Sequence, residues 1–113
     1  MRRVPTPEFK RDLVQCIKRS ARQFGKQASI RYENLILVAL EEISKDPLLQ
    51  HSRDAHGVRL YHLRHSKKDA TVDGIPVKNP RHFIAYRVNG EVIEVLRLLH
   101  DSRDIGSHLP DEE

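Results

Sequence analysis

The feature that most constrains this chain is a pair of β-prone runs, His82 to Val88 and Glu91 to Leu98, separated by Asn89-Gly90. An Asn-Gly pair supplies the two positive φ angles of a type I′ turn, so it is a strong signal for a β-hairpin. A two-residue loop also sets the register, and it predicts that Tyr86 faces Ile93 across the two strands. Because both faces of this ribbon are mostly apolar, we expect the hairpin to lie in the centre of a packed sheet.

Two amphipathic segments precede the hairpin. The first runs from Pro7 to Phe24, with Thr6 as its N-cap and Gly25 as its stop. The second runs from about Gln27 to Lys45 and ends at Asp46-Pro47, because a residue that precedes proline disfavours helix. A link this short predicts that the two helices form an antiparallel hairpin.

The stretches between the second helix and the hairpin carry weaker signals. Val58 to Leu63 is typical of a short strand, whereas Pro47 to Gly57 shows no periodicity and is interpreted as a connection. Arg64 to Asn79 is polar and is interpreted as a long loop, a kind of segment that is often mobile or functional. This loop holds the densest basic segment outside the first helix, made of Arg64, Lys67, Lys68 and Lys78.

The length and charge of the chain limit what it can be. Its 113 residues suffice for one domain, which we place at residues 1–110, followed by an acidic disordered tail at residues 111–113. The net charge is +4, but the three tail acids leave 20 basic against 13 acidic residues in the rest, a balance of 20 − 13 = +7. A basic body suits an acidic partner, either nucleic acid or an acidic protein surface, although scattered lysines in a soluble protein give the same count.

The sequence also indicates a compartment. No apolar run approaches the ~18 residues of a membrane span, and the N-terminus lacks the apolar centre of a signal peptide. The single cysteine excludes an internal disulfide, which fits a reducing environment. We therefore expect a cytoplasmic protein without a membrane partner.

Metal and cofactor sites have little support in the sequence. His62 and His65 stand three residues apart, but no third ligand follows at a recognisable interval. Cys16 falls on the apolar side of the first helix, where an inert buried thiol is the ordinary outcome. No glycine-rich phosphate loop is present, so we expect neither a metal nor a cofactor.

Three strings in the second half of the chain resemble a known family. They are Pro80-Arg81-His82, then Tyr86-Arg87-Val88 before the turn, and Val95 to His100 followed by Arg103-Asp104. This strand–turn–strand layout, ending in Leu-His-x-x-Arg-Asp, resembles the C-terminal half of ParE toxins in the ParE/RelE toxin superfamily, and the likeness extends over roughly Pro5 to Leu109. The resemblance implies an edge strand at Arg2 to Val4. It also implies an α+β fold, with an N-terminal helical hairpin packed on a small, mainly antiparallel sheet of three to four strands.

The resemblance further implies a function. ParE proteins are toxins of type II toxin–antitoxin modules that inhibit DNA gyrase by binding, so no enzymatic activity of the chain itself is expected. The residues of the resembling segment that could touch gyrase or another partner are Arg81, His82, Arg87, Arg97, His100, Arg103 and Asp104. Guanidinium groups suit this role because they form paired hydrogen bonds to carboxylate or phosphate.

An antitoxin is the second implied partner, expected to be ParD-like, to carry an acidic C-terminal arm and to form a hetero-oligomer with the toxin. Three apolar residues lie outside the core stripe of the second helix, namely Ile30, Leu37 and Val38. Either the segment after Pro47 covers them, or they belong to a surface that the antitoxin buries. Arg11 and Lys18, on the cationic side of the first helix, are candidate contacts for the acidic arm.

Two alternatives remain open at this point. RelE-type toxins cut messenger RNA on the ribosome, and His82 with His100 could act as acid and base. Against this activity, the strand Val58 to Leu63 lacks lysine, Phe83 stands where that branch has an arginine, and Asp101 adds an acid. The other alternative is a member without toxicity that only binds an antitoxin or co-represses a promoter.

Overall fold

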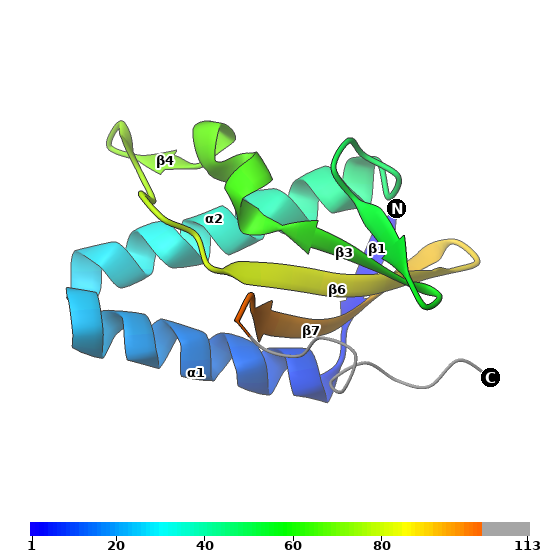
Figure 1. Ribbon diagram of the computed structural model, residues 1–113, viewed down its shortest axis with the longest axis horizontal. Helices are drawn as coiled ribbons and strands as arrows, with labels where there is room; N and C mark the ends of the chain where they lie inside the picture. Colours follow the sequence, from blue (N-terminus) through cyan, green and yellow to red (C-terminus); the bar gives the residue numbers. More distant parts are fainter. Residues whose placement is uncertain (103–113) are drawn as a thin grey trace.

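The structure is a computed structural model that describes residues 1–102 of the chain. Its elements are β1 (Arg2–Pro5), α1 (Pro7–Phe24), α2 (Lys26–Lys45), β2 (Arg53–Ala55), β3 (Val58–His62), the 3₁₀-helix η1 (Leu63–Asp69), β4 (Thr71–Val72), β5 (Ile75–Pro76), β6 (His82–Asn89) and β7 (Val92–His100). Figure 1 shows α1 and α2 as an antiparallel pair beside the sheet. The predicted α+β architecture is confirmed. The boundary between a domain ending at residue 110 and the acidic tail lies outside the described residues.

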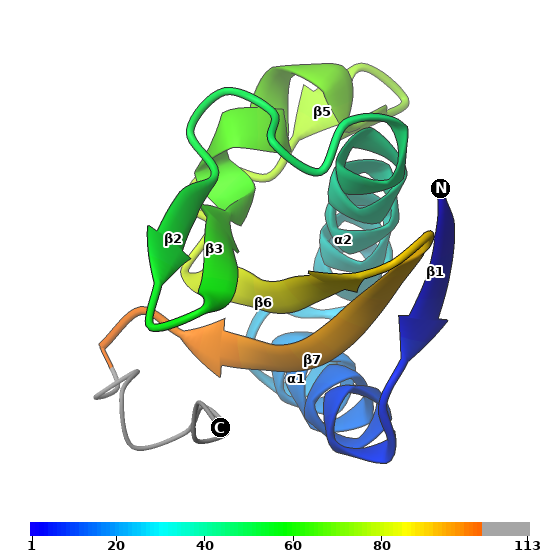
Figure 2. The ribbon, with the colours of Figure 1, turned by 90° about the vertical axis from the view of Figure 1, so that its right-hand side faces the viewer.

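The sheet is larger than the three to four strands predicted. It has five strands in the order β1-β7-β6-β3-β2, with β1 parallel to β7 and all other pairs antiparallel. The β6–β7 hairpin is central, as predicted, and Figure 2 shows the helical pair along one side of the curved sheet. The extra strand β2 comes from the segment after Pro47, where three residues pair with β3 without any periodic pattern that the sequence could reveal.

Local signals explain the two helices. The Thr6 hydroxyl accepts a hydrogen bond from the backbone N–H of Phe9 at 3.1 Å, and Pro7 occupies the first helical position. Gly25 has a φ of 93°, a value that side-chain-bearing residues rarely adopt, and it both ends α1 and begins α2. Within residues 1–102, neither helix is long and apolar enough to cross a membrane.

The predicted register of the hairpin is wrong. Tyr86 pairs with Val95 rather than with Ile93, because the loop consists of Gly90-Glu91 instead of Asn89-Gly90. Of these two loop residues, only Gly90 has a positive φ, at 64°, the pattern of a type II′ turn with glycine in its first central position. A bulge between Ala85 and Tyr86 then shifts the pairing by one more residue.

The segment 64–79 is also more ordered than predicted. Instead of a loop it contains most of η1 and the small β4–β5 hairpin. The His62 ring accepts a hydrogen bond from the backbone N–H of Arg64 at 3.1 Å and so caps η1, while the hydroxyls of Tyr61 and Ser66 lie 2.8 Å apart beneath it. These two contacts are local, and the buried Leu63 also packs η1 into the core beside residues of α2.

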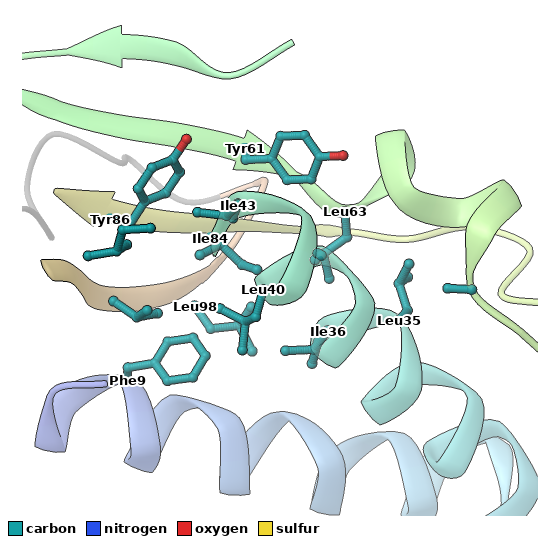
Figure 3. Close-up of a cluster of buried hydrophobic side chains, with 14 of the residues drawn as sticks. Phe9, Leu35, Ile36, Leu40, Ile43, Tyr61, Leu63, Ile84, Tyr86 and Leu98 are labelled. Carbon is teal, nitrogen blue, oxygen red and sulfur yellow. The ribbon is translucent and has the colours of Figure 1, made fainter. Parts of the chain in front are cut away.

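Two buried clusters hold the sheet on its opposite faces. The larger one joins α1 and α2 to β3, β6 and β7, and its members include Phe9, Leu40, Ile84 and Tyr86 (Figure 3). The smaller one is formed by Val58, Leu60, Ala85 and Leu96, with Phe83 packed against it. Neighbouring residues of a strand point to opposite faces, so the prediction that both faces of the hairpin are largely apolar is confirmed.

Candidate functional site

A basic concave surface lies where the α1–α2 turn, β5 and the adjoining ends of β6 and β7 meet. It is a cleft of about 910 Å³. Its lining includes five cationic side chains, those of Arg19, Arg31, Lys78, Arg81 and Arg97. Within the described lining, Asp12 is the one acidic residue. Phe24 and Ile75 stand at the cleft with 74% and 49% of their surfaces exposed, so the cleft combines positive charge with exposed apolar groups.

Arg97 is held in this cleft by a carboxylate of α1. Its Nε donates to Asp12 Oδ2 at 2.7 Å and its second terminal nitrogen donates to Asp12 Oδ1 at 3.1 Å. These bonds raise the pKa of Arg97, so its charge is permanent. Asp12 Oδ2 also accepts the backbone N–H of Leu98 at 3.0 Å, so the guanidinium is tied to both helix and strand.

A second carboxylate orients Arg81. The Nε of Arg81 lies 3.0 Å and 3.1 Å from the two oxygens of Asp101, and a terminal nitrogen lies 2.9 Å from Oδ1. Hydrogen bonds from Arg81, aided by one from His62 Nε2 at 3.0 Å, lower the pKa of Asp101 to about 2. Burial lowers the pKa of His62 itself, so that ring donates as a neutral imidazole.

The floor of the cleft contains Tyr32 and His82. The backbone N–H of Arg81 donates to the Tyr32 hydroxyl at 3.1 Å, and this hydroxyl lies 2.6 Å from His82 Nδ1, to which it donates. Burial lowers the pKa of His82 to about 4, so the ring is neutral near pH 7. Its Nε2 lies 3.9 Å from the Cys16 sulfur, and burial raises the pKa of that thiol to about 11, which fits the predicted inert cysteine.

The structure divides the gyrase candidates into separate groups. Arg81, His82, Arg97 and His100 all line the cleft, although His82 is engaged with Tyr32 and Arg97 with Asp12. Arg87 lies six residues along β6 from Arg81, a distance of roughly 20 Å in a strand. Arg103 and Asp104 lie outside the described residues.

The Arg87 side chain has a partner of its own in the sheet. It pairs with Glu94 at 3.1 Å. Glu94 lies directly opposite Arg87 on β7, whereas the predicted register would place it diagonally opposite. Both side chains are partly exposed, and pairs of this kind contribute little to stability.

The antitoxin candidates lie on other surfaces. Ile30 and Leu37 are 41% and 46% exposed on α2, so the segment after Pro47 does not cover them, whereas Val38 packs against the core. Arg11 lies 3.8 Å from Glu8, and Lys18 is exposed on α1. None of the five lines the cleft.

Sequence reasoning missed several residues of the cleft. Lys78 was noted only as part of a basic segment, and neither Arg19 nor Tyr32 was singled out. A tyrosine in an apolar helical stripe does carry one usable signal, because a buried hydroxyl needs a hydrogen-bond partner. Its actual partners, His82 and the Arg81 backbone, are 50 and 49 residues away and could not be read from spacing.

No cluster of three or more histidine, cysteine, aspartate or glutamate side chains is placed to hold a metal ion within residues 1–102. The two histidines His51 and His65 stack with ring centroids 4.1 Å apart, but they form a pair without a third ligand. The cleft therefore offers charge and hydrogen bonding from side chains to whatever it binds.

Comparison with known proteins places the chain in a family. A family model described as the ParE toxin of the type II toxin–antitoxin system parDE matches residues 4–105. The chain belongs to the ParE toxin family. The matched range includes both helices, the whole five-stranded sheet except part of β1, and the Leu-His-x-x-Arg-Asp segment on which the resemblance was based.

A solved ParE-related structure supports the fold. The chromosomal ParDE toxin–antitoxin system from P. aeruginosa contains a chain that is 16% identical to this one, with a TM-score of 0.67. The alignment covers 88% of this chain and 95% of that chain. A search among curated proteins found no match.

Proposed function

We propose that this ParE family member inhibits DNA gyrase by binding it and is neutralised by a cognate antitoxin. The observation that carries the proposal is the family match over residues 4–105, which continues through the end of β7 into the Leu-His-x-x-Arg-Asp segment. At that end the fold exposes Arg81, whose side chain is 48% accessible, beside His100 on the neighbouring strand. A rigid, exposed guanidinium beside a strand end suits the recognition of a carboxylate or a phosphate.

The state of the histidines favours binding over RNA cleavage. His82 Nδ1 already accepts the Tyr32 hydroxyl, and a pKa of about 4 makes its ring a weak base at neutral pH. His100 Nδ1 lies 2.7 Å from the Ser102 hydroxyl and 3.1 Å from the Ser102 N–H, which donates to it. The two rings meet edge to face with centroids 5.2 Å apart. This arrangement favours packing of His82 against His100 over a role for the two rings as acid and base.

The cleft is the surface that we assign to the antitoxin arm. Acidic groups of such an arm would meet Arg19, Arg31 and Lys78, and its apolar groups would cover Phe24 and Ile75. The ParDE system from P. aeruginosa pairs a protein of this fold with an antitoxin, which supports a ParD-like partner here. Ile30 and Leu37, together with Arg11 and Lys18, would extend this contact along the helices if the arm continued beyond the cleft.

The deciding experiment is a supercoiling assay with purified protein, relaxed plasmid, ATP and DNA gyrase. We expect supercoiling to fall as the protein is added, cleaved plasmid to accumulate, and both effects to disappear when the cognate antitoxin is present. Unchanged supercoiling with a correctly folded protein would contradict gyrase inhibition.

The same preparation tests the alternatives. Ribosome-dependent cleavage of a message, with gyrase unaffected, would favour the RelE-like activity. Failure of both assays, with antitoxin binding retained and growth unaffected by expression, would indicate the member without toxicity.

A further inference from the structure

A second basic pocket, separate from the antitoxin cleft, adjoins it across the chain segment that ends at Arg81. It measures about 650 Å³. Its lining includes four cationic residues, Arg64, Lys67, Lys78 and Arg81, and one acidic residue within the described part of the chain, Asp101. This pocket contains three of the four cations of the basic segment at residues 64–79, Arg64, Lys67 and Lys78, which the sequence showed and which the proposed function leaves largely unexplained.

The fold brings these cations together and holds two of them, Lys67 and Arg81, in place. The Lys67 ammonium on η1 donates a hydrogen bond to the backbone carbonyl of Lys78 at 2.7 Å. This bond ties the 3₁₀-helix to the segment that precedes β6. Arg81 is oriented by the three contacts that its Nε and one terminal nitrogen make with Asp101. The other terminal nitrogen takes no part in those contacts, and so it retains two N–H donors for a ligand.

The charge of the pocket is strongly positive. Asp101 is ionised, because its pKa is lowered to about 2, and it offsets one of the four cations. His62 adds no charge near pH 7, since burial lowers its pKa. Arg64 and Lys78 are exposed, and neither side chain makes an ion pair with another residue of the segment 1–102.

The chemistry of the pocket indicates which anion it suits. A single-stranded nucleic acid would need a free aromatic face on which its bases could stack. Phe83 is the aromatic carbocycle in the described lining, but the His62 ring meets it edge to face at 4.8 Å and the Arg53 guanidinium lies 5.6 Å from its centroid. An apolar peptide also has little to hold here, because the exposed Phe24 and Ile75 belong to the antitoxin cleft. What remains is a set of cationic donors without base-reading groups, of which Lys67 and Arg81 are held in place, and such a set matches a phosphate backbone.

We propose that Arg64, Lys67, Lys78 and Arg81 form a binding site for the phosphate backbone of duplex DNA. The inference rests on the proposed function and deepens it: the toxin contacts the DNA that gyrase holds as well as the enzyme. Lys78 and Arg81 line both the pocket and the antitoxin cleft, so an antitoxin arm in the cleft competes with DNA for these two side chains.

The test measures binding of the purified toxin to a fluorescent 20-base-pair duplex by anisotropy, at KCl concentrations from about 25 to 200 mM. Each phosphate contact contributes about 0.9 to the slope of log K against log salt concentration, so about four contacts predict a slope near −3.6. The variant Arg64→Gln/Lys78→Gln removes two contacts and should flatten the slope by about 1.8.

A matched control separates a local site from the overall charge. Lys10→Gln/Lys45→Gln removes the same charge from the first turn of α1 and the last turn of α2, and neither residue lines the pocket. This control should keep the wild-type slope. Circular dichroism of both variants checks that they fold.

Three outcomes would overturn the DNA site: no duplex binding at 25 mM KCl, equal slopes for the wild type and the Arg64→Gln/Lys78→Gln variant, or an equal loss in the Lys10→Gln/Lys45→Gln control. Tighter binding to single-stranded RNA of the same length, lost in the Arg64→Gln/Lys78→Gln variant, would also overturn it in favour of RNA. The supercoiling assay distinguishes this failure from failure of the proposed function. If gyrase is unaffected while the slopes differ as expected, gyrase inhibition fails and the DNA site stands.

Discussion

Asp12 of α1 binds Arg97 of β7 through two charge-assisted hydrogen bonds, and it also accepts the backbone N–H of Leu98. This contact lies beyond the end of β1, where β7 still pairs with β6 but has no neighbouring strand on its other side. Thr6 also takes the place of a paired strand here. Its N–H donates to Val95 O and its hydroxyl donates to Leu96 O, each at 2.9 Å. The start of α1 therefore completes the edge of the sheet and presents Arg97 to the cleft.

Replacing Asp12 with asparagine should destabilise the protein. The carboxylate and the guanidinium are only 16% and 23% exposed, so the loss of charge leaves a poorly solvated cation. We expect the free energy of unfolding to fall by about 2 kcal/mol, as measured by urea denaturation. Glu8→Gln breaks the exposed pair with Arg11 and should change the free energy of unfolding by less than about 0.5 kcal/mol. Similar values for the two variants would contradict a structural role for Asp12.

Replacing Tyr86 with phenylalanine should loosen the segment after α2. The Tyr86 hydroxyl donates to Pro47 O at 2.6 Å and lies 2.6 Å from the Ser52 hydroxyl, which also accepts from Arg59 Nε at 2.9 Å. Loss of this buried hydroxyl should cost about 1–3 kcal/mol of unfolding free energy. Amide exchange over residues 47–52 should accelerate more than exchange in α1, and uniform acceleration would argue against a local anchor.

Stability should fall on mild acidification. Burial lowers the pKa of His82 to about 4, from an ordinary 6.5, and that of His65 likewise to about 4. Between pH 6.5 and 4 the unfolded chain therefore binds more protons than the folded one, so the stabilisation is complete above 6.5 and is lost as the pH drops toward 4. For His82 the loss between pH 7 and pH 4.5 amounts to about 2 kcal/mol, to be measured by urea denaturation at these two pH values.

Two asparagine variants test whether His82 causes this pH dependence of stability. His82→Asn retains an acceptor for the Tyr32 hydroxyl but does not titrate, so its loss of stability on acidification should be smaller than that of the wild type. His56→Asn changes an exposed turn residue with a φ of 56°, which asparagine tolerates, and should retain the wild-type pH dependence. An undiminished loss in His82→Asn would show that burial of this ring does not cause the effect.

The two ends of β6 should contribute differently to gyrase inhibition. Arg81 lines both the antitoxin cleft and the second basic pocket. Arg81→Gln should therefore raise the toxin concentration that half-inhibits gyrase about tenfold, the effect of losing one charge-assisted hydrogen bond. Arg87 is occupied by Glu94 at the turn end of the strand, so Arg87→Gln should have less than about a twofold effect. The reverse order would move the gyrase contact to the β6–β7 turn.

Antitoxin affinity should depend on the exposed apolar residues of the cleft. Phe24→Ser and Ile75→Ser should each weaken binding about tenfold or more in isothermal titration calorimetry, since a buried aromatic or aliphatic anchor contributes about 1.5–3 kcal/mol. Ile30→Ser and Leu37→Ser, on α2 outside the cleft, should have smaller effects. If the α2 pair proves the more sensitive, the arm follows the helix instead of the cleft.

Much of the architecture was predictable because its signals are local. Thr6, Pro7 and Gly25 mark the ends of α1, and the β-prone runs on either side of Gly90 indicate the central hairpin. The exact loop was not predictable, since both Asn89-Gly90 and Gly90-Glu91 are acceptable turn pairs. The second pair forms the loop, with Asn89 opposite Val92 and a bulge between Ala85 and Tyr86.

The sequence by itself determined the two helices, the central hairpin, the basic character of the chain and the family resemblance, because capping, periodicity and motif spacing act over a few residues. Only the tertiary structure decided which cations face the cleft. Arg97 is directed there by Asp12, 85 residues earlier, and Arg81 by Asp101, 20 residues later. Side-chain pairing at such separations depends on how the helices dock on the sheet, and no local pattern encodes the position of that contact.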